Sequence, residues 1–118
     1  MEEIYKNIKD YEGLYQISNF GRVKSLKRKV KQSNGFEYEI KERVLKLSYH
    51  TNGYVGITLN KEGKKRFLVH RLVAEHFLEN EGNLPQVNHK DLDKANNRVE
   101  NLEWVTKSEN QLHYYRNI

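Results

Sequence analysis

Three polar residues near the C-terminal end have types and spacing that could support chemistry. His89 ends a short extended stretch, Asn101 precedes a second one, and Asn110 falls in the first turn of a predicted helix. Because a strand end and the first turn of a helix packed across a strand pair face one another, Asn88, His89 and Asn110 are expected to surround one small volume. Taken singly, loop asparagines usually only form turns, so it is the combination that indicates a site.

These residues must be positioned by a strand, loop, strand and helix. We expect strands at residues 86–89 and 102–105, separated by a loop rich in Asp, Lys and Asn. Thr106 and Glu109 have the spacing of a capping box, which predicts a helix over residues 107–115. A further amphipathic helix is expected over residues 70–79, ended by Gly82. The chain has no cysteine, so any metal at the site would be held by His, Asn, Asp or Glu.

The first part of the chain has the two-residue periodicity of short antiparallel strands. Apolar residues alternate with polar ones in several runs between residues 11 and 69, and glycine-containing turns separate the runs. The predicted fold class is therefore α+β. We expect a β-rich segment at residues 1–69, followed by the joining helix and the strand, loop, strand and helix unit at residues 70–118.

Length and charge limit the class of protein. A chain of 118 residues is one domain's worth, which excludes a large multidomain enzyme, and no apolar run approaches the roughly 18 residues of a membrane span. The N-terminus has no signal-peptide pattern. Residues 1–71 hold 16 of the 21 Lys and Arg but only 8 of the 16 Asp and Glu, so the front is basic and the back mildly acidic. This division indicates a polyanionic partner for the front part.

Several motifs together resemble one family. Residues 87–91 (Val-Asn-His-Lys-Asp), 96–106 (from Asn-Asn-Arg to Trp-Val-Thr) and 109–110 (Glu-Asn) resemble the HNH endonucleases of phages. Residues 11–26 are similar to the nuclease-associated modular segment that precedes such units, and residues 70–74 to the joining helix. The resemblance implies a ββα-metal finger that hydrolyses DNA phosphodiester bonds, nicking one strand or cutting both.

The resemblance also implies roles for individual residues. His89 would be the general base, and Asn101 would orient the His89 ring or tie the loop to the second strand. Asn110 and Asn88 would hold Mg²⁺ or Mn²⁺ through amide oxygens. Many relatives carry Asp where this chain has Asn88, which implies weaker metal binding here.

Double-stranded DNA is the partner that the resemblance and the basic front part imply, with the protein a monomer or homodimer in the bacterial cytoplasm, away from membranes. The residues expected to contact DNA are Arg22, Lys24, Lys27, Arg28, Lys29 and Arg71. Asp91 and His113 are expected to be structural, although either could touch the metal. Two alternatives are a DNA-binding or phage accessory protein whose nuclease site has decayed, and a general RNA-binding basic protein, which would leave the polar triplet unexplained.

Overall fold

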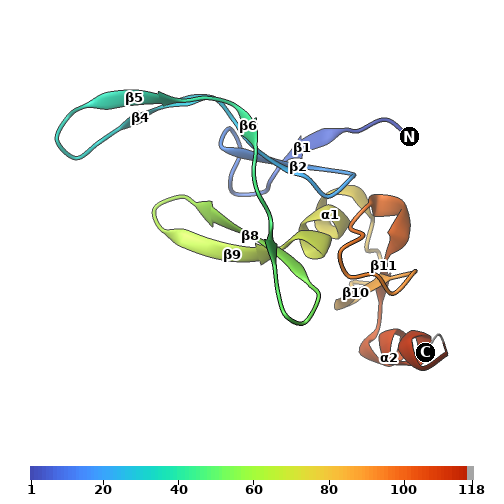
Figure 1. The fold of residues 1–118 in the computed structure, drawn as a ribbon. Helices are drawn as coiled ribbons and strands as arrows, with labels where there is room; N and C mark the ends of the chain where they lie inside the picture. The colour runs from blue at the N-terminus through green and yellow to red at the C-terminus, as the bar shows by residue number, and fades with distance from the viewer. Residues whose placement is uncertain (117–118) are drawn as a thin grey trace.

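The computed structural model describes residues 1–116, apart from the side chains of residues 114 and 115. Its strands are β1 (Tyr5–Asn7), β2 (Tyr15–Ser18), β3 (Val23–Ser25), β4 (Arg28–Lys31), β5 (Glu37–Ile40), β6 (Arg43–Val44), β7 (Ser48–Tyr49), β8 (Val55–Asn60), β9 (Lys64–Leu68), β10 (Gln86–His89) and β11 (Leu102–Val105). Its helices are α1 (Val69–Phe77), the 3₁₀ turn η1 (Val99–Asn101) and α2 (Lys107–Arg116). The predicted α+β class is confirmed, because every strand pair is antiparallel and no helix connects two parallel strands (Figure 1).

Two small sheets form the front part. One has the order β1-β2-β3-β6 and the other the order β7-β8-β9, and each joins strands that alternate apolar and polar residues. Helix α1 contacts β2, β8 and β9 on one side and β10 and β11 on the other. The helix has no side-chain cap at its N-terminus, so the packing of its apolar face is what stabilises it.

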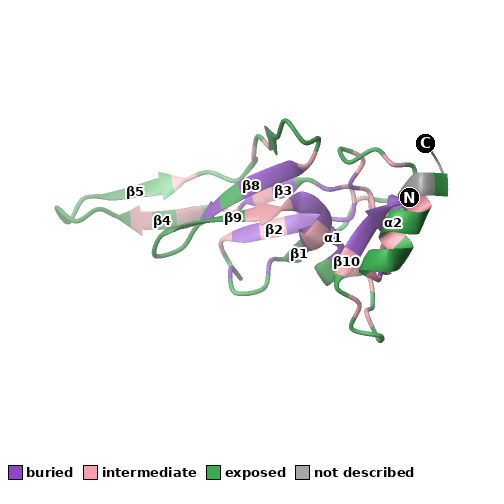
Figure 2. Cartoon of the chain, turned by 90° about the horizontal axis from the view of Figure 1, so that it is seen from below, coloured by how far each residue is buried: buried purple, intermediate pink, exposed green. Residues whose placement is uncertain are grey.

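A single hydrophobic core connects the front and back parts. Ile17 of the first sheet, Leu59 of the second, Val73 of α1 and Leu102 of β11 belong to one cluster, and each is 2% exposed or less. Figure 2 shows this buried layer running from β8 through α1 to β10. The predicted boundary between a segment at residues 1–69 and a unit at residues 70–118 stays a prediction. Side chains from the two segments pack together in this core.

The β4–β5 hairpin extends away from this core (Figure 1). We call residues 28–40 the arm. None of its residues is buried (Figure 2), and its length contributes to a molecule of 57 × 29 × 25 Å. Lys29 lies opposite Glu39 and Lys31 opposite Glu37, so one face of the arm carries two pairs of opposite charge.

The capping box starts α2 as predicted. The backbone N–H of Glu109 donates to Thr106 Oγ1, and the backbone N–H of Thr106 donates to Glu109 Oε1, each at 3.1 Å. This reciprocal pair fixes the first turn of the helix, and with it the position of Asn110. No helix within residues 1–116 is long and apolar enough to cross a membrane.

Candidate active site

Strand β10, the loop that follows it and helix α2 form the walls of a cleft of about 470 Å³. Strands β10 and β11 pair in a register that sets Gln86 opposite Val105 and His89 opposite Leu102. The cleft is lined by Tyr54, Gln86, Val87, Asn88, His89, Leu92, Lys94, Lys107, Asn110 and Gln111. The structure therefore brings Asn88, His89 and Asn110 together around one space.

A hydrogen bond selects one tautomer of the neutral His89 imidazole. Its side chain is buried, and Nε2 lies 2.7 Å from Oδ1 of Asn97. An amide oxygen can only accept, so Nε2 carries the proton and donates it in this hydrogen bond. Nδ1 is then the nitrogen that keeps a lone pair, which makes neutral His89 a proton acceptor.

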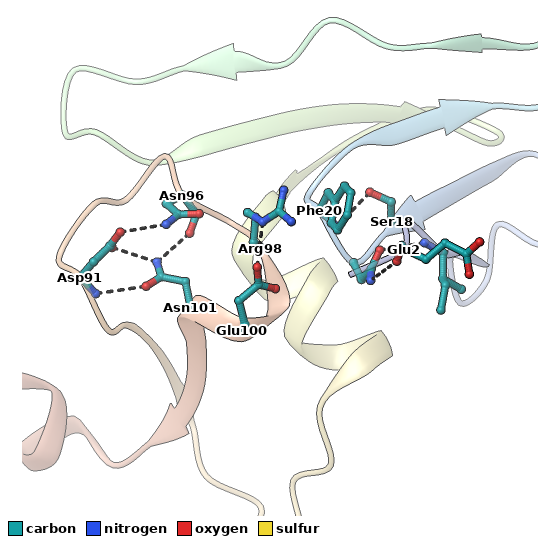
Figure 3. A network of polar contacts seen from close by, with 10 residues as sticks. Glu2, Ser18, Phe20, Asp91, Asn96, Arg98, Glu100 and Asn101 are labelled. Carbon is teal, nitrogen blue, oxygen red and sulfur yellow. Dashed lines mark hydrogen bonds and ion pairs between the residues drawn. The ribbon is translucent and has the colours of Figure 1, made fainter.

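Asn97 is held in turn by the front part of the chain. The backbone N–H of Val99 donates to the carbonyl of Asn19 at 2.9 Å, and the Arg98 guanidinium lies 3.8 Å from the centre of the Phe20 ring. Figure 3 shows the Arg98 side chain, at the end of the 91–98 loop, beside Phe20. Gly21, at φ +87°, approaches so closely that a Cβ there would lie 3.0 Å from Asn97 Cβ and 3.1 Å from its carbonyl oxygen. Asn97 thus packs directly against the turn at residues 19–21.

Gly21→Ala is expected to lower the free energy of unfolding by about 2–3 kcal/mol, because alanine is strained at positive φ and its methyl group would press on Asn97. Gly13→Ala is the matched control, since Gly13 has φ +80° but nothing within 4 Å of its Cβ position. The control is expected to cost about 1 kcal/mol, the penalty of the backbone conformation alone. Urea denaturation of both variants measures the difference, and equal losses would contradict a role for the close approach.

Asn101 lies in a different network from His89. Its Nδ2 donates to Asp91 Oδ1 and to the carbonyl of Asn96, both at 2.9 Å, and its Oδ1 accepts from the Asp91 N–H at 3.1 Å (Figure 3). Of the two roles expected for Asn101, the structure shows the tying of the loop to the second strand. The side chain that holds the His89 ring is Asn97, which spacing alone did not distinguish from its neighbours in an asparagine-rich loop.

Asp91 is the centre of that loop network. It accepts from Asn96 Nδ2 at 2.8 Å and from the backbone N–H of Asp93 at 2.8 Å, in addition to Asn101. The hydrogen bond from Asn96, followed by that from the Asp93 backbone, holds the pKa of the Asp91 carboxyl below its usual value. The carboxylate is used to brace the loop.

Asn88 and Asn110 offer amide oxygens to the cleft. Asn110 donates through Nδ2 to Gln86 Oε1 at 3.0 Å, which leaves its Oδ1 available. The Asn88 side chain is buried and makes no hydrogen bond with any residue that the structure describes. Neutral oxygen donors suit a hard cation such as Mg²⁺, although more weakly than carboxylates do. Within residues 1–116, no group of three or more His, Asp or Glu side chains could hold a metal.

His113 ties α2 to the end of β10. Its Nε2 lies 2.9 Å from the carbonyl oxygen of Lys90, to which it can only donate. It also lines a second cavity, which contains Asn88, Glu103 and Glu109. A half-exposed helical position was expected for His113, and whether it touches a metal stays a prediction.

Most of the basic residues expected to bind DNA lie beside carboxylates. Arg22 pairs with Glu3 at 2.9 Å, Lys24 with Glu42 at 3.9 Å, and Lys27 with Glu39 at 3.6 Å. One partner of each pair is more than half exposed to solvent, which keeps the ion pairs weak, so their cations could exchange carboxylate for phosphate. Lys29 is exposed on the arm opposite Glu39.

Two of the arginines hold the fold together. Arg28 Nη1 donates to the carbonyls of Leu14 and Leu26 and to Ser25 Oγ, at 3.0–3.2 Å, which anchors the base of the arm. Arg71 donates to the Pro85 carbonyl at 3.0 Å and lies over the Trp104 ring. Both guanidinium groups are thus engaged by the protein itself.

Three residues at the cleft were missed by the sequence reasoning. Lys94 and Lys107 bring cations to its lining, and Tyr54 comes from the turn before β8. Lys94 Nζ donates to the Asn52 carbonyl at 3.0 Å and lies 4.7 Å from the Tyr54 ring centre, so the front part closes one side of the cleft. A lysine in a polar loop gives no periodic signal, and the approach of Tyr54 is a long-range contact.

His70 lies behind the cleft, in the first turn of α1. Its ring centre is 5.1 Å from that of His89 and 5.1 Å from that of Tyr54, on which it stacks. Burial, with smaller contributions from His89 and Arg71, lowers the pKa of His70 to about 4. His70 is therefore uncharged at neutral pH.

Known proteins match both parts of the chain. Residues 3–60 match the NUMOD4 motif and residues 67–112 match the HNH endonuclease family. The chain is 44% identical over 112 residues to the DNA endonuclease I-HmuI of Bacillus phage SP01, covering 92% of this chain and 57% of that protein. It is 38% identical over 117 residues to the uncharacterized HNH endonuclease L247 of Acanthamoeba polyphaga mimivirus, covering 94% and 26%.

A solved structure has the same fold. The structure described as DNA binding and cleavage by the HNH homing endonuclease I-HmuI superposes with a TM-score of 0.73 at 41% identity, covering 100% of this chain and 61% of that one. The chain thus spans less than two thirds of the length of these relatives. Its two motifs, in this order and on this fold, place it in the family of phage-type HNH homing endonucleases that carry a NUMOD4 motif.

Proposed function

We propose that this chain hydrolyses phosphodiester bonds of double-stranded DNA, with His89 as general base. The observation that carries the proposal is the His89–Asn97 hydrogen bond, which leaves Nδ1 as the proton acceptor of a residue lining a polar cleft. A water molecule would give its proton to Nδ1 as its oxygen bonds to phosphorus, and the bond from phosphorus to the 3′ oxygen would break. Asn97 Oδ1 would stabilise the resulting imidazolium through the Nε2 proton.

A divalent cation, Mg²⁺ or Mn²⁺, fits the donors of the cleft. HNH endonucleases generally use a divalent metal, and the amide oxygens of Asn88 and Asn110 would hold it here. When bound, the cation would stabilise charge on the scissile phosphate and the leaving oxygen. Because both protein donors are neutral, we expect phosphate oxygens and water to complete its coordination.

The front part would hold the duplex. I-HmuI binds DNA, and the exposed lysines of the arm, with the loosely paired Lys24 and Lys27, would contact the backbone on either side of the cut. Arg28 and Arg71 would support this surface from inside the fold. A monomer or a homodimer could present it.

Supercoiled plasmid and the cognate genomic DNA test the function. Purified protein with Mn²⁺ or Mg²⁺ is expected to produce nicked or linear products, and EDTA is expected to abolish them. Mapping the ends of the products reports the strand choice and the spacing of the cuts. Intact DNA with both metals would overturn the proposal.

Lys107→Gln is expected to weaken DNA binding and to lower the slope of log Kd against log salt concentration by about 0.9, because one phosphate contact is lost. Fluorescence anisotropy in EDTA measures binding without cleavage. Lys9→Gln removes an exposed lysine outside the cleft and is the control, with an unchanged slope expected. A slope of Lys107→Gln equal to that of the wild type would place Lys107 away from the phosphates.

Asn88→Asp is expected to lower the Mg²⁺ concentration for half-maximal cleavage by about 10-fold or more, because a carboxylate is the stronger ligand of a hard cation. Asn7→Asp adds the same charge at an exposed position outside the cleft, keeps the oxygen that accepts from Gln16 Nε2, and is expected to change nothing. A metal titration of the cleavage rate compares them. If the wild type is inactive and Asn88→Asp cuts, the chain is a DNA-binding protein with a decayed nuclease site, a second candidate that the neutral Asn88 favours.

A further inference from the structure

Three aromatic rings from three parts of the chain lie against one another beside the cleft. Tyr54 comes from the turn at residues 50–54, His70 from α1 and His89 from the end of β10. Tyr54 and His70 are stacked, with ring centres 5.1 Å apart and planes at 25°. His70 and His89 are also 5.1 Å apart with planes at 51°, and Tyr54 reaches to 6.3 Å from His89.

His70 is packed almost entirely against protein. Its side chain is 6% exposed, it does not line the cleft, and its Nδ1 is buried without a hydrogen-bond partner. A buried nitrogen without a partner costs stability, and a leucine or phenylalanine at this position would avoid that cost. Satisfaction of its own polar atoms therefore does not explain the residue at this position, and the contacts that its flat ring makes are with the rings of Tyr54 and His89.

His89 needs such a contact. Its hydrogen bond to Asn97 is a single contact, and rotation of the ring about its Cβ–Cγ bond would break that contact and carry Nδ1 away from the attacking water. A ring packed against it blocks this rotation. Misplacement of a reacting group by about 1 Å can cost about 100-fold in rate, so the orientation of the ring has a large effect on rate.

Tyr54 is fixed firmly enough to serve as the base of the stack. Its backbone N–H donates to Asn52 Oδ1 at 3.1 Å, and its carbonyl accepts from the His50 N–H at 3.0 Å. The Lys94 cation lies 4.7 Å from the centre of its ring and is itself bonded to the Asn52 carbonyl. Tyr54 is thus held both by its own turn and by Lys94 of the 91–98 loop.

We propose that Tyr54 and His70 are positioning residues that hold the imidazole of His89 in its reactive orientation. The proposal rests on the assignment of His89 as general base, and it extends the active site into the NUMOD4 segment, which supplies Tyr54. The front part then has a second role beside DNA binding, because it completes the support of the catalytic ring.

The experiment compares ring-removing and ring-retaining variants. His70→Leu and Tyr54→Leu remove a ring, His70→Phe and Tyr54→Phe keep one, and Tyr49→Leu removes an exposed ring outside the stack. Long-range ¹H–¹⁵N spectra of the imidazole of His89 report its tautomer in the free protein. Single-turnover cleavage and DNA binding in EDTA report the rate constant and the affinity, and thermal unfolding confirms the fold.

Loss of either ring is expected to replace the single Nε2–H tautomer of His89 by a mixture and to lower kcat about 10-fold, with affinity for DNA within about twofold of the wild type. The Phe variants and Tyr49→Leu are expected to behave as the wild type. An unchanged His89 spectrum and kcat in Tyr54→Leu and in folded His70→Leu would overturn the proposal. The spectra need neither DNA nor metal, so inactivity of the wild type would contradict the proposed function while the tautomer still tests the stack.

Discussion

His89→Ala is expected to lower the single-turnover rate of DNA cleavage by about 10²–10⁴-fold, the contribution of a positioned general base. The reason is that Nδ1 of His89, which the hydrogen bond from Nε2 to Asn97 leaves unprotonated, is the proton acceptor that we propose. The cation would remain held by Asn88 and Asn110, so a slow metal-dependent reaction is expected to persist. Rates at saturating protein, on a labelled duplex containing the mapped site, measure the loss.

His50→Ala is the control for this substitution. His50 is an exposed histidine in the turn at residues 50–54 and does not line the cleft. Its removal is expected to change the rate less than about threefold. Affinity for DNA in EDTA is expected to be the same for both variants and the wild type. A His89→Ala rate within about threefold of the wild type would assign the proton transfer to another group.

The second large effect is a loss of stability in acid that originates at His70. Because burial lowers the pKa of His70 from 6.5 to about 4, the unfolded chain takes up a proton there at a pH where the folded protein does not. The folded state is therefore fully favoured above pH 6.5 and loses free energy of unfolding as the pH falls toward 4. A shift of this size corresponds to about 3 kcal/mol.

His70→Phe isolates this contribution from the carboxylates that also titrate in acid. Urea denaturation at intervals from pH 7.5 to 4 measures the free energy of unfolding of both proteins. The wild type is expected to lose about 3 kcal/mol more than His70→Phe over this range, and the variant is expected to be at least as stable at pH 7, since the buried Nδ1 that lacks a partner is removed. Parallel curves would mean that His70 protonates equally easily in both states.

The local elements of this fold could be predicted from the sequence because neighbouring residues determine them. The strands at residues 86–89 and 102–105 and the capping box at Thr106 and Glu109 lie where they were expected. The first helix was predicted to continue to residue 79 and end through Gly82, which is wrong. It ends at Phe77, where Leu78 turns to an extended conformation and Asn80 bonds both backbone groups of Leu84.

The parts of the site that could not be predicted depend on contacts between distant segments. Tyr54 and Gly21 reach the cleft and its support across more than 30 residues, and no periodicity reports such a contact. Asn97 and Asn101 are both loop asparagines, and only the folded loop shows which of them bonds His89. The excess of basic charge was visible in the sequence, but the pairing of Arg22 with Glu3 was not.

The close contact between Asn97 and the turn at residues 19–21 limits how such proteins can recombine their segments. Nucleases built from sequential motifs are naturally described as modules that recombine at the junctions between them. Here the residue that holds the imidazole of His89 lies against Gly21, so a chimera joined near residue 67 would combine this imidazole with a supporting turn from another protein. Recombination that preserves activity must therefore carry the turn at residues 19–21 and the loop at residues 91–98 together. The segment that must be inherited as one piece is therefore longer than the HNH motif and includes residues 19–21.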